Sequence, residues 1–278
     1  MQVFSTVAEF RQACTQAKRP LGLVPTMGAL HAGHTALIRR SVDECKTTAA
    51  TLFVNPAQFG PKEDFNSYPR NVQADMGTFE HEGVNLLFTP STDEVYPPDF
   101  DTWVHAGKLS ERLEGEFRPG HFRGVATVVC KLLSIARPDK AYFGQKDVQQ
   151  TLVIKRINTD LNLGADIVVV PTVREPDGLA LSSRNVKLNP DERRVATVLY
   201  NALSLAKEAV ANGATDAGAI RAAMEELLRK EPLAQMDYAT ITDASTLEQL
   251  DAISRPALAL IAARIGKTRL IDNMPLYP

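Results

Sequence analysis

Two histidines stand three residues apart in a glycine-containing stretch that could bind an anion. Residues 25–34 read Pro-Thr-Met-Gly-Ala-Leu-His-Ala-Gly-His and end with His31 and His34. Residues three apart lie side by side on a helical turn, so both imidazoles could donate hydrogen bonds to one group. Gly28 and Gly33 have no side chain, and backbone and ligand can approach closely there. This combination favours a bound phosphate.

The elements expected around this stretch support the same interpretation. A short apolar run at 21–24 is typical of a buried parallel strand, and residues 35–42 have helical spacing. A helix that begins near Gly33 would direct unpaired N–H groups and a partial positive charge at a ligand, which suits phosphate. Open α/β sheets bind their ligands outside the carboxyl ends of the strands. The two histidines are therefore expected where a ligand binds.

Two other interpretations of the turn are an ordinary strand–helix connection with surface histidines, and a zinc site. The chain has only five histidines, and two of them flank a glycine at a strand end, which favours phosphate. Zinc is less favoured because no third cysteine or carboxylate ligand stands nearby at a motif spacing.

A second junction, Gly144-Gln145-Lys146-Asp147, repeats this pattern after the apolar strand expected at 140–143. Lys146 offers a positive charge for a phosphate. Asp147 could accept hydrogen bonds from a ribose or help to hold Mg²⁺. It would equally serve as a helix N-cap, and this alternative stays open.

Three further features carry chemistry. Residues 181–185, Leu-Ser-Ser-Arg-Asn, present two hydroxyls and a guanidinium that could grip a polyphosphate, or they form a solvated linker. Gln58 and Gln150 are uncharged groups that both donate and accept hydrogen bonds. They could orient a hydroxy acid, or they are exposed glutamines.

The composition is that of a globular protein without a nucleic-acid or membrane partner. The 278 residues are 44% hydrophobic and 23% charged, with a net charge of −2. No basic stripe predicts nucleic-acid binding, no apolar stretch could span a bilayer, and the first residues lack a secretion signal. We therefore expect a cytoplasmic protein. Three cysteines without a CxxC motif indicate reduced thiols.

The predicted elements define two domains. Strands alternate with helices up to residue 170, which predicts βαβ units and a mostly parallel α/β sheet in a domain of residues 1–175. Residues 176–278 are expected to form a smaller α+β domain. Within it we expect one long helix over 190–212, a second over 216–230, and strands at 237–242, 257–265 and 268–272, the last two joined by a turn at Gly266-Lys267.

At this point the motifs resemble those of a known family. Residues 25–34, 54–61, 121–124, 142–147 and 181–185 are similar to segments of the pantothenate synthetase family, or pantoate–β-alanine ligases, within the HxGH nucleotidylyl transferase superfamily. They occur in the family's order and span nearly the whole chain. The His-x-Gly-His element alone also resembles class I aminoacyl-tRNA synthetases. Gln145 stands where some members carry glutamate.

The resemblance implies a two-domain fold, with a Rossmann-like parallel sheet that has helices on both faces, and it also implies an activity. Members condense pantoate with β-alanine, converting ATP to AMP and diphosphate through a pantoyl-adenylate intermediate, with magnesium. They are usually cytoplasmic homodimers. Residues 1–175 would bind nucleotide and pantoate, and residues 176–278 would close over the ATP site. The resemblance assigns no protein ligand to the magnesium ion.

The resemblance also implies roles for individual positions. His34 would be the catalytic proton donor, acting with His31, Lys146 and Arg184. Gln58 and Gln150 would bind pantoate, and Gln58 would also approach β-alanine. The ATP site would be formed by Met27, Gly28, Ala29, Leu30, His31, Ala32, Gly33, His34, Gly144, Gln145, Lys146, Asp147, Val173, Leu181, Ser182, Ser183 and Arg184.

Two alternative functions belong to other classes. A nucleotidylyl transferase would use the same histidine chemistry but would keep the nucleotide on its product. A non-catalytic nucleotide-binding or RNA-associated protein could share the fold. The complete set of His31, His34, Lys146 and Arg184 argues against lost catalysis, and the negative net charge argues against RNA.

Overall fold

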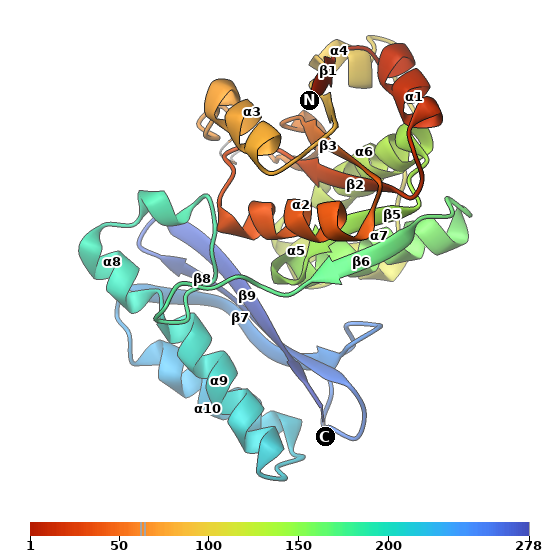
Figure 1. Cartoon of the computed structure of the whole chain (residues 1–278). Coiled ribbons are helices and arrows are strands. Elements are labelled where there is room, and N and C mark those ends of the chain that lie inside the picture. The colour runs from red at the N-terminus through yellow and green to blue at the C-terminus, as the bar shows by residue number, and fades with distance from the viewer. Residues whose placement is uncertain (62, 64, 278) are drawn as a thin grey trace. The chain divides into compact units, whose positions relative to one another are not determined.

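The computed structural model describes residues 1–61, 63 and 65–277, which form two compact units (Figure 1). The N-terminal unit comprises Met1–Gln145 and Gln149–Pro171, and the C-terminal unit comprises Lys146–Val148 and Thr172–Pro278. The short segment Lys146–Val148 therefore groups with the C-terminal unit, although its neighbours in the chain belong to the other.

A six-stranded parallel sheet forms the centre of the N-terminal unit. Its strand order is β1-β4-β3-β2-β5-β6. The chain runs from β2 outward to β3 and β4 on one side, then returns to place β5 and β6 on the other. The β2–β5 pair is thus a switch point, where sheets of this kind bind ligands. The strands are β1 (Gln2–Phe4), β2 (Leu21–Thr26), β3 (Thr47–Leu52), β4 (Leu86–Phe88), β5 (Lys140–Gly144) and β6 (Asp166–Val170).

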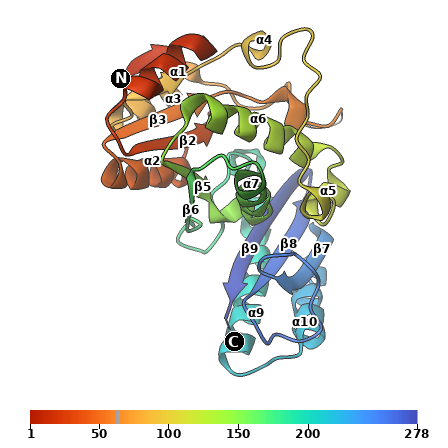
Figure 2. The same cartoon turned by 90° about the vertical axis from the view of Figure 1, so that its right-hand side faces the viewer.

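Helices cover both faces of this sheet, as the sequence predicts (Figures 1 and 2). Successive side chains of a strand point to opposite faces, so Leu23 of β2 enters one apolar cluster and Val24 the other. The Leu23 cluster includes residues of α1 (Val7–Gln16), α6 (His121–Ala136) and α7 (Val148–Asp160). The Val24 cluster includes residues of α2 (Ala32–Glu44) and α3 (Val72–His81).

Short helices of three or four residues connect the longer elements. The short helices are η1 (Pro56–Gln58), α4 (Thr92–Val95), η2 (Gly107–Ser110), α5 (Glu114–Phe117), η3 (Gln145–Asp147) and η4 (Asn185–Lys187). Cys14, Cys45 and Cys130 are free thiols, and burial raises the pKa of Cys14 to about 12. Across the described residues, every helix is too short or too polar to cross a bilayer.

The C-terminal unit packs three helices against a three-stranded antiparallel sheet, and Figure 2 shows β7, β8 and β9 side by side. The strands are β7 (Ala234–Asp243), β8 (Ala257–Ile265) and β9 (Thr268–Leu276), and the predicted turn at Gly266-Lys267 joins β8 to β9. The helices are α8 (Pro190–Val195), α9 (Val198–Ala211) and α10 (Ala217–Arg229). This α+β arrangement confirms the predicted fold class.

Two local predictions were wrong. The helix expected over 190–212 is divided into α8 and α9, because the backbone tightens between them: the Leu199 N–H donates to the Ala196 carbonyl, three residues back, at 3.3 Å. Strand β1 was not predicted at all. It has three residues and is defined by parallel pairing with β4, Gln2 opposite Leu86, which a local pattern does not reveal.

Candidate active site

The turn between β2 and α2 has a backbone that only certain residues tolerate. Gly28 has φ +84° and Ala29 has φ +51°. The buried carboxylate of Asp75 on α3 accepts the backbone N–H groups of Ala29, at 3.0 Å, and Leu30, at 2.9 Å. A Cβ on Gly28 would lie 2.7 Å from the Asp75 Oδ2 atom. Glycine is therefore needed here for conformation and for space.

The two histidines cap the start of α2 and lie against each other. His31 is the N-cap, and its Nδ1 accepts the Gly33 N–H at 3.1 Å. The Nδ1 of His34 accepts the His31 N–H at 3.3 Å, and the ring centroids are 4.2 Å apart. A backbone N–H can only donate, so each neutral ring carries its proton on Nε2. Each neutral ring thus has Nε2–H as its donor, and the two rings lie side by side as the spacing predicts.

One expectation about this turn was wrong. The first N–H groups of the helix do not all remain for a ligand, because Gly33 donates to the His31 ring and His34 donates to the His31 carbonyl at 2.8 Å. This reciprocal capping uses up donors that an uncapped helix would offer. The structure therefore leaves fewer backbone N–H groups for a ligand than an uncapped helix start would.

Gln58 lies beside the first residue of this turn. Its Nε2 donates to the Met27 sulfur at 3.2 Å, and its Oε1 accepts from the Asn55 amide at 3.0 Å. Asn55 is buried, and its Oδ1 accepts from the Tyr96 hydroxyl at 2.8 Å. The structure thus brings a predicted pantoate residue, Gln58, against a predicted ATP residue, Met27.

A buried histidine from the 121–124 motif supports the same loop. The His121 Nδ1 donates to the Gln58 carbonyl at 2.8 Å, so its Nε2 accepts from the Arg118 guanidinium at 3.1 Å. Arg118 in turn makes a bidentate pair with Glu63, with both distances 2.7 Å. Burial, and then the nearby Arg118 charge, lower the pKa of His121 from its ordinary value of 6.5 to about 4. His121 is therefore a neutral support for Gln58 at physiological pH.

Gln150 lies partly exposed on the first turn of α7, while its neighbour Gln149 is buried. The Gln149 amide donates to the carbonyls of Leu109 and Arg112, at 2.8 and 2.7 Å, and accepts the Glu114 N–H at 3.1 Å. Gln149 thus anchors the connection before α6. The sequence gives no signal that separates this structural glutamine from Gln150.

The Lys146 turn is held by a strand far away in the sequence. The Lys146 carbonyl accepts from the Asn273 side-chain amide at 2.8 Å, and Asn273, on β9, is 2% exposed. The Lys146 ammonium lies 3.7 Å from an Asp147 carboxylate oxygen. Side-chain exposure is 20% for Lys146 and 46% for Asp147, so both side chains are accessible to a ligand.

Residues 173–185 of the C-terminal unit form a compact bonded segment. The Leu181 N–H donates to the Val173 carbonyl at 3.0 Å, which joins two predicted ATP residues. The Arg184 N–H donates to the Ser182 hydroxyl at 3.2 Å, and the Asn185 amide donates to the Ala180 carbonyl at 3.1 Å. These bonds order the segment, and its ligand-binding role stays a prediction.

Arg174 and Asp272 hold that segment to β9. Their bidentate pair has distances of 2.6 and 3.0 Å, and Arg174 also donates to the Gly178 carbonyl at 3.0 Å. Burial raises the pKa of Asp272, and the Arg174 charge opposes this rise. The sequence alone does not reveal Arg174, Asp272 or Asn273 as supporting residues, because no motif marks them. Arg174 is 98 residues from Asp272, and Asn273 is 127 residues from Lys146.

The predicted site residues divide between the two units. The N-terminal unit contains residues 27–34, Gln58, Gly144, Gln145 and Gln150, and the C-terminal unit contains Lys146, Asp147, Val173 and residues 181–184. Among the residues that the structure describes, no group of three or more histidine, cysteine, aspartate or glutamate side chains could hold a metal ion.

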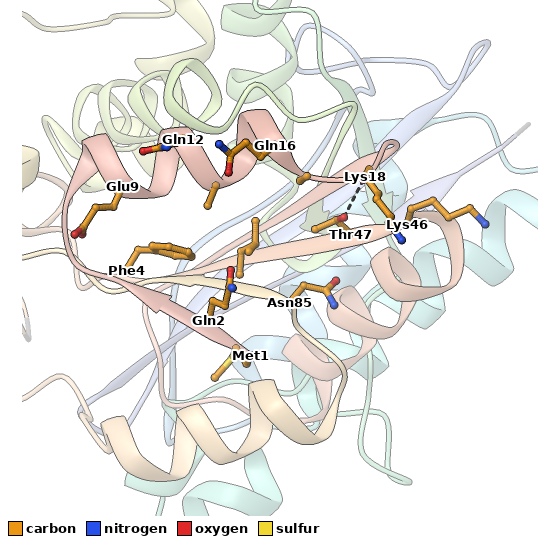
Figure 3. A pocket seen from close by; sticks show the side chains of 13 residues that line it. Met1, Gln2, Phe4, Glu9, Gln12, Gln16, Lys18, Lys46, Thr47 and Asn85 are labelled. Atoms are coloured by element: carbon orange, nitrogen blue, oxygen red, sulfur yellow. Dashed lines mark hydrogen bonds between the residues drawn. The ribbon is translucent and has the colours of Figure 1, made fainter.

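A cavity of about 740 Å³ lies at the opposite ends of the strands from these turns. Figure 3 shows amide side chains of α1 facing those at the amino ends of β1 and β4, with Lys18 and Lys46 together at one side. Its lining contains none of the predicted site residues: Met1, Gln2, Phe4, Glu9, Gln12, Ala13, Gln16, Ala17, Lys18, Lys46, Thr47, Asn85 and Leu86.

The sheet order and the small α+β unit together define a two-unit protein of Rossmann-like α/β architecture. A family model described as pantoate-beta-alanine ligase matches residues 2–275. The chain belongs to the pantoate–β-alanine ligase family.

Relatives over the full length agree. A pantothenate synthetase of Roseiflexus sp. (strain RS-1) is 54% identical over 276 residues, which is 99% of each chain. The crystal structure of pantothenate synthetase from Thermus thermophilus is 46% identical, with a TM-score of 0.96 over 100% of both chains. A pantoate-beta-alanine ligase from Francisella tularensis, complexed with beta-gamma ATP and beta-alanine, is 32% identical with a TM-score of 0.81, covering 99% of this chain and 97% of that one.

Proposed function

We propose that the chain makes pantothenate in two steps, activation of pantoate by ATP and then capture of the activated acid by β-alanine. The overall reaction is that of the family to which the chain belongs, ATP-dependent ligation of pantoate and β-alanine. The observation that carries the mechanism is the pair of adjacent imidazoles of His31 and His34, 4.2 Å apart and each accepting a backbone N–H at Nδ1, at the carboxyl end of β2 next to the switch point.

In the first step the pantoate carboxylate, already ionised at neutral pH, attacks the α-phosphorus of ATP in line. The new bond joins a carboxylate oxygen to phosphorus, and the bond to the bridging oxygen of diphosphate breaks. Negative charge grows on the bridging oxygen. His34 donates a proton or hydrogen bond there from Nε2, and His31, Lys146 and Arg184 stabilise the charge.

In the second step the neutral amine of β-alanine attacks the acyl carbon of pantoyl adenylate. The carbon–oxygen bond to AMP breaks, AMP leaves with the electron pair, and the new amide nitrogen releases a proton. Gln58 and Gln150 orient pantoate, and Gln58 also approaches β-alanine. The bonds of the Gln58 side chain to Met27 and Asn55 support a pre-organised role.

Magnesium enters this reaction as part of the ATP substrate. Mg²⁺ usually keeps several waters and binds substrate phosphates together with one or two carboxylates, rather than a dedicated protein cluster. The half-exposed carboxylate of Asp147, next to Lys146, is a suitable single ligand. The remaining predicted ATP residues would contact the nucleotide: Met27, Gly28, Ala29, Leu30, Ala32, Gly33, Gly144, Gln145, Val173, Leu181, Ser182 and Ser183.

We also propose a cytoplasmic homodimer whose C-terminal domain closes over bound ATP. The resemblance of the motifs supports this proposal. Light scattering would give twice the chain mass, and hydrogen exchange would slow at residues 182–184 on adding ATP. A monomeric mass would contradict the homodimer, and hydrogen exchange that ATP leaves unchanged would contradict the closure.

The direct test is to incubate the protein with ATP, Mg²⁺ and pantoate, with or without β-alanine. Diphosphate should form with pantoate alone up to about one equivalent of enzyme, and AMP should accumulate only when β-alanine is added. A final product that still carries the nucleotide after β-alanine has been added would indicate a nucleotidylyl transferase. Absence of pantoate-dependent diphosphate would overturn the proposal.

A further inference from the structure

We infer that the adjacent residues Asp272 and Asn273 of β9 are positioning residues for ATP binding, acting through Lys146 and through the 173–184 segment. This inference rests on the proposed role of those segments in holding ATP. Its basis is that one dipeptide bonds directly to both of them within the C-terminal unit.

The first contact sets the backbone beneath Lys146. The Asn273 amide donates to the Lys146 carbonyl at 2.8 Å, and Asn273 is 2% exposed. The three residues of η3 form a single short turn that makes few backbone bonds of its own. A buried side-chain donor on its central carbonyl therefore restricts where the Lys146 side chain begins.

The second contact sets the 173–184 segment. Asp272 receives both guanidinium nitrogens of Arg174, and the same guanidinium donates to the Gly178 carbonyl and lies 4.9 Å from the centre of the Tyr200 ring. Arg174 follows Val173 directly, and Val173 is bonded to Leu181. The Asp272–Arg174 pair thus holds the base of the segment that leads to Arg184.

The two contacts are also joined to each other. The Asn273 N–H donates to the Asp272 carboxylate at 2.8 Å, and the Asn273 carbonyl accepts from Arg174 at 3.4 Å. Pairing of β9 with β8, where Asn273 stands opposite Leu260 and Asp272 opposite Ile261, fixes the dipeptide in a buried sheet. A shift at this point would move Lys146 and the 173–184 segment together. Such small displacements strongly reduce catalysis.

The test compares Asn273→Ala with Met274→Ala, a control at the next position of β9 that removes core packing but no bond to Lys146. Asn273→Ala should weaken ATP binding in calorimetry and lower kcat/KM for ATP by roughly 10- to 100-fold, with KM for pantoate nearly unchanged. Met274→Ala should lower the melting temperature without this selective effect. Equal ATP affinities for the two variants would overturn the inference.

A double variant distinguishes this inference from the proposed function. If Asn273 acts through Lys146, the Asn273→Ala change should weaken ATP binding much less in a Lys146→Ala background than in the wild type. Wild-type ATP affinity of Lys146→Ala alone would contradict the proposed function. Loss of affinity in Lys146→Ala together with full additivity of Asn273→Ala would contradict only the inference.

Two further variants guard against misfolding. Asn273→Ser replaces the amide donor with a hydroxyl donor on a shorter side chain. It should weaken ATP binding selectively, as Asn273→Ala does, but by a smaller factor. Asp272→Asn keeps the volume but removes the charge that pairs with Arg174, and it should raise KM for ATP more than KM for pantoate. Parallel changes in both KM values would count against a positioning role.

Discussion

The two strand-to-helix turns, residues 27–31 and 144–147, look alike in the sequence but are held in place by different means. In the first turn, His31 and His34 cap their own helix through bonds that span two or three residues. In the second, the central carbonyl depends on Asn273, 127 residues later. The capping bonds of the first turn can be recognised in a motif, whereas its bonds to Asp75 and the bond of the second turn to Asn273 join distant residues and are hidden from the sequence.

The glycines of the two turns also differ, in how closely their surroundings constrain them. Gly28 has a positive φ, and a Cβ there would meet both Asp75 and Leu52 at 2.7 Å. At Gly144, no described heavy atom outside its chain neighbours lies within 4 Å of a built Cβ, and φ is not positive. One glycine is required by the fold, while the other leaves open space in front of a strand end.

The largest expected effect concerns the side chains that the two turns present. His34→Ala and Lys146→Ala should each slow adenylate formation by about two to three orders of magnitude, because each removes a preorganised donor to developing charge. Single-turnover release of diphosphate measures this step, and circular dichroism should show an intact fold. A wild-type rate for either variant would remove that turn from the mechanism.

The glycines test the comparison directly. Gly28→Ala should lower the free energy of unfolding by about 2–4 kcal/mol, through left-handed strain and overlap with Asp75. Gly144→Ala should change it by less than about 1 kcal/mol, because its backbone conformation suits alanine. Urea denaturation measures both values. Similar losses for the two variants would show that the turns are not held differently.

The loop after β3 is a third strand end for this comparison. Its carbonyl at Gln58 is supported by the distant His121, whose protonation can be changed with pH. The pKa of His121 is lowered to about 4 in the fold, so the unfolded chain binds a proton first as the pH falls below its ordinary value of 6.5. The stability that neutral His121 contributes is complete above pH 6.5 and is lost as the pH falls toward 4. Between pH 7 and 5 the free energy of unfolding should fall by about 2 kcal/mol more for the wild type than for His121→Gln. Parallel pH dependences would refute this assignment.

The smallest effect separates two neighbouring glutamines. Gln150→Ala should raise KM for pantoate about tenfold, the loss expected from one hydrogen bond, and leave KM for ATP nearly unchanged. Gln149→Ala should instead lower the melting temperature, because its amide joins α7 to the carbonyls of Leu109 and Arg112. A larger change in KM for ATP than for pantoate would refute the role given to Gln150.

The sequence predicted those parts of the molecule whose partners are near in the chain. The α/β alternation, the β8–β9 turn and the side-by-side histidines follow from local spacing, and the structure confirms all three. The roles of individual site residues stay predictions. Asp75 could not be found because it stabilises a turn 45 residues away, and Asp272 and Asn273 could not because only sheet pairing brings them to Arg174 and Lys146.

The chain passes between the two compact units three times, at 145/146, 148/149 and 171/172. A fragment that ends at Pro171 would retain Lys146 but lose the strand on which that lysine's carbonyl rests. The N-terminal unit by itself therefore lacks the native support of the Lys146 turn. Chimaeras between relatives should exchange residues 146–148 together with the C-terminal unit, so that the hydrogen bond from Asn273 to the Lys146 carbonyl is preserved.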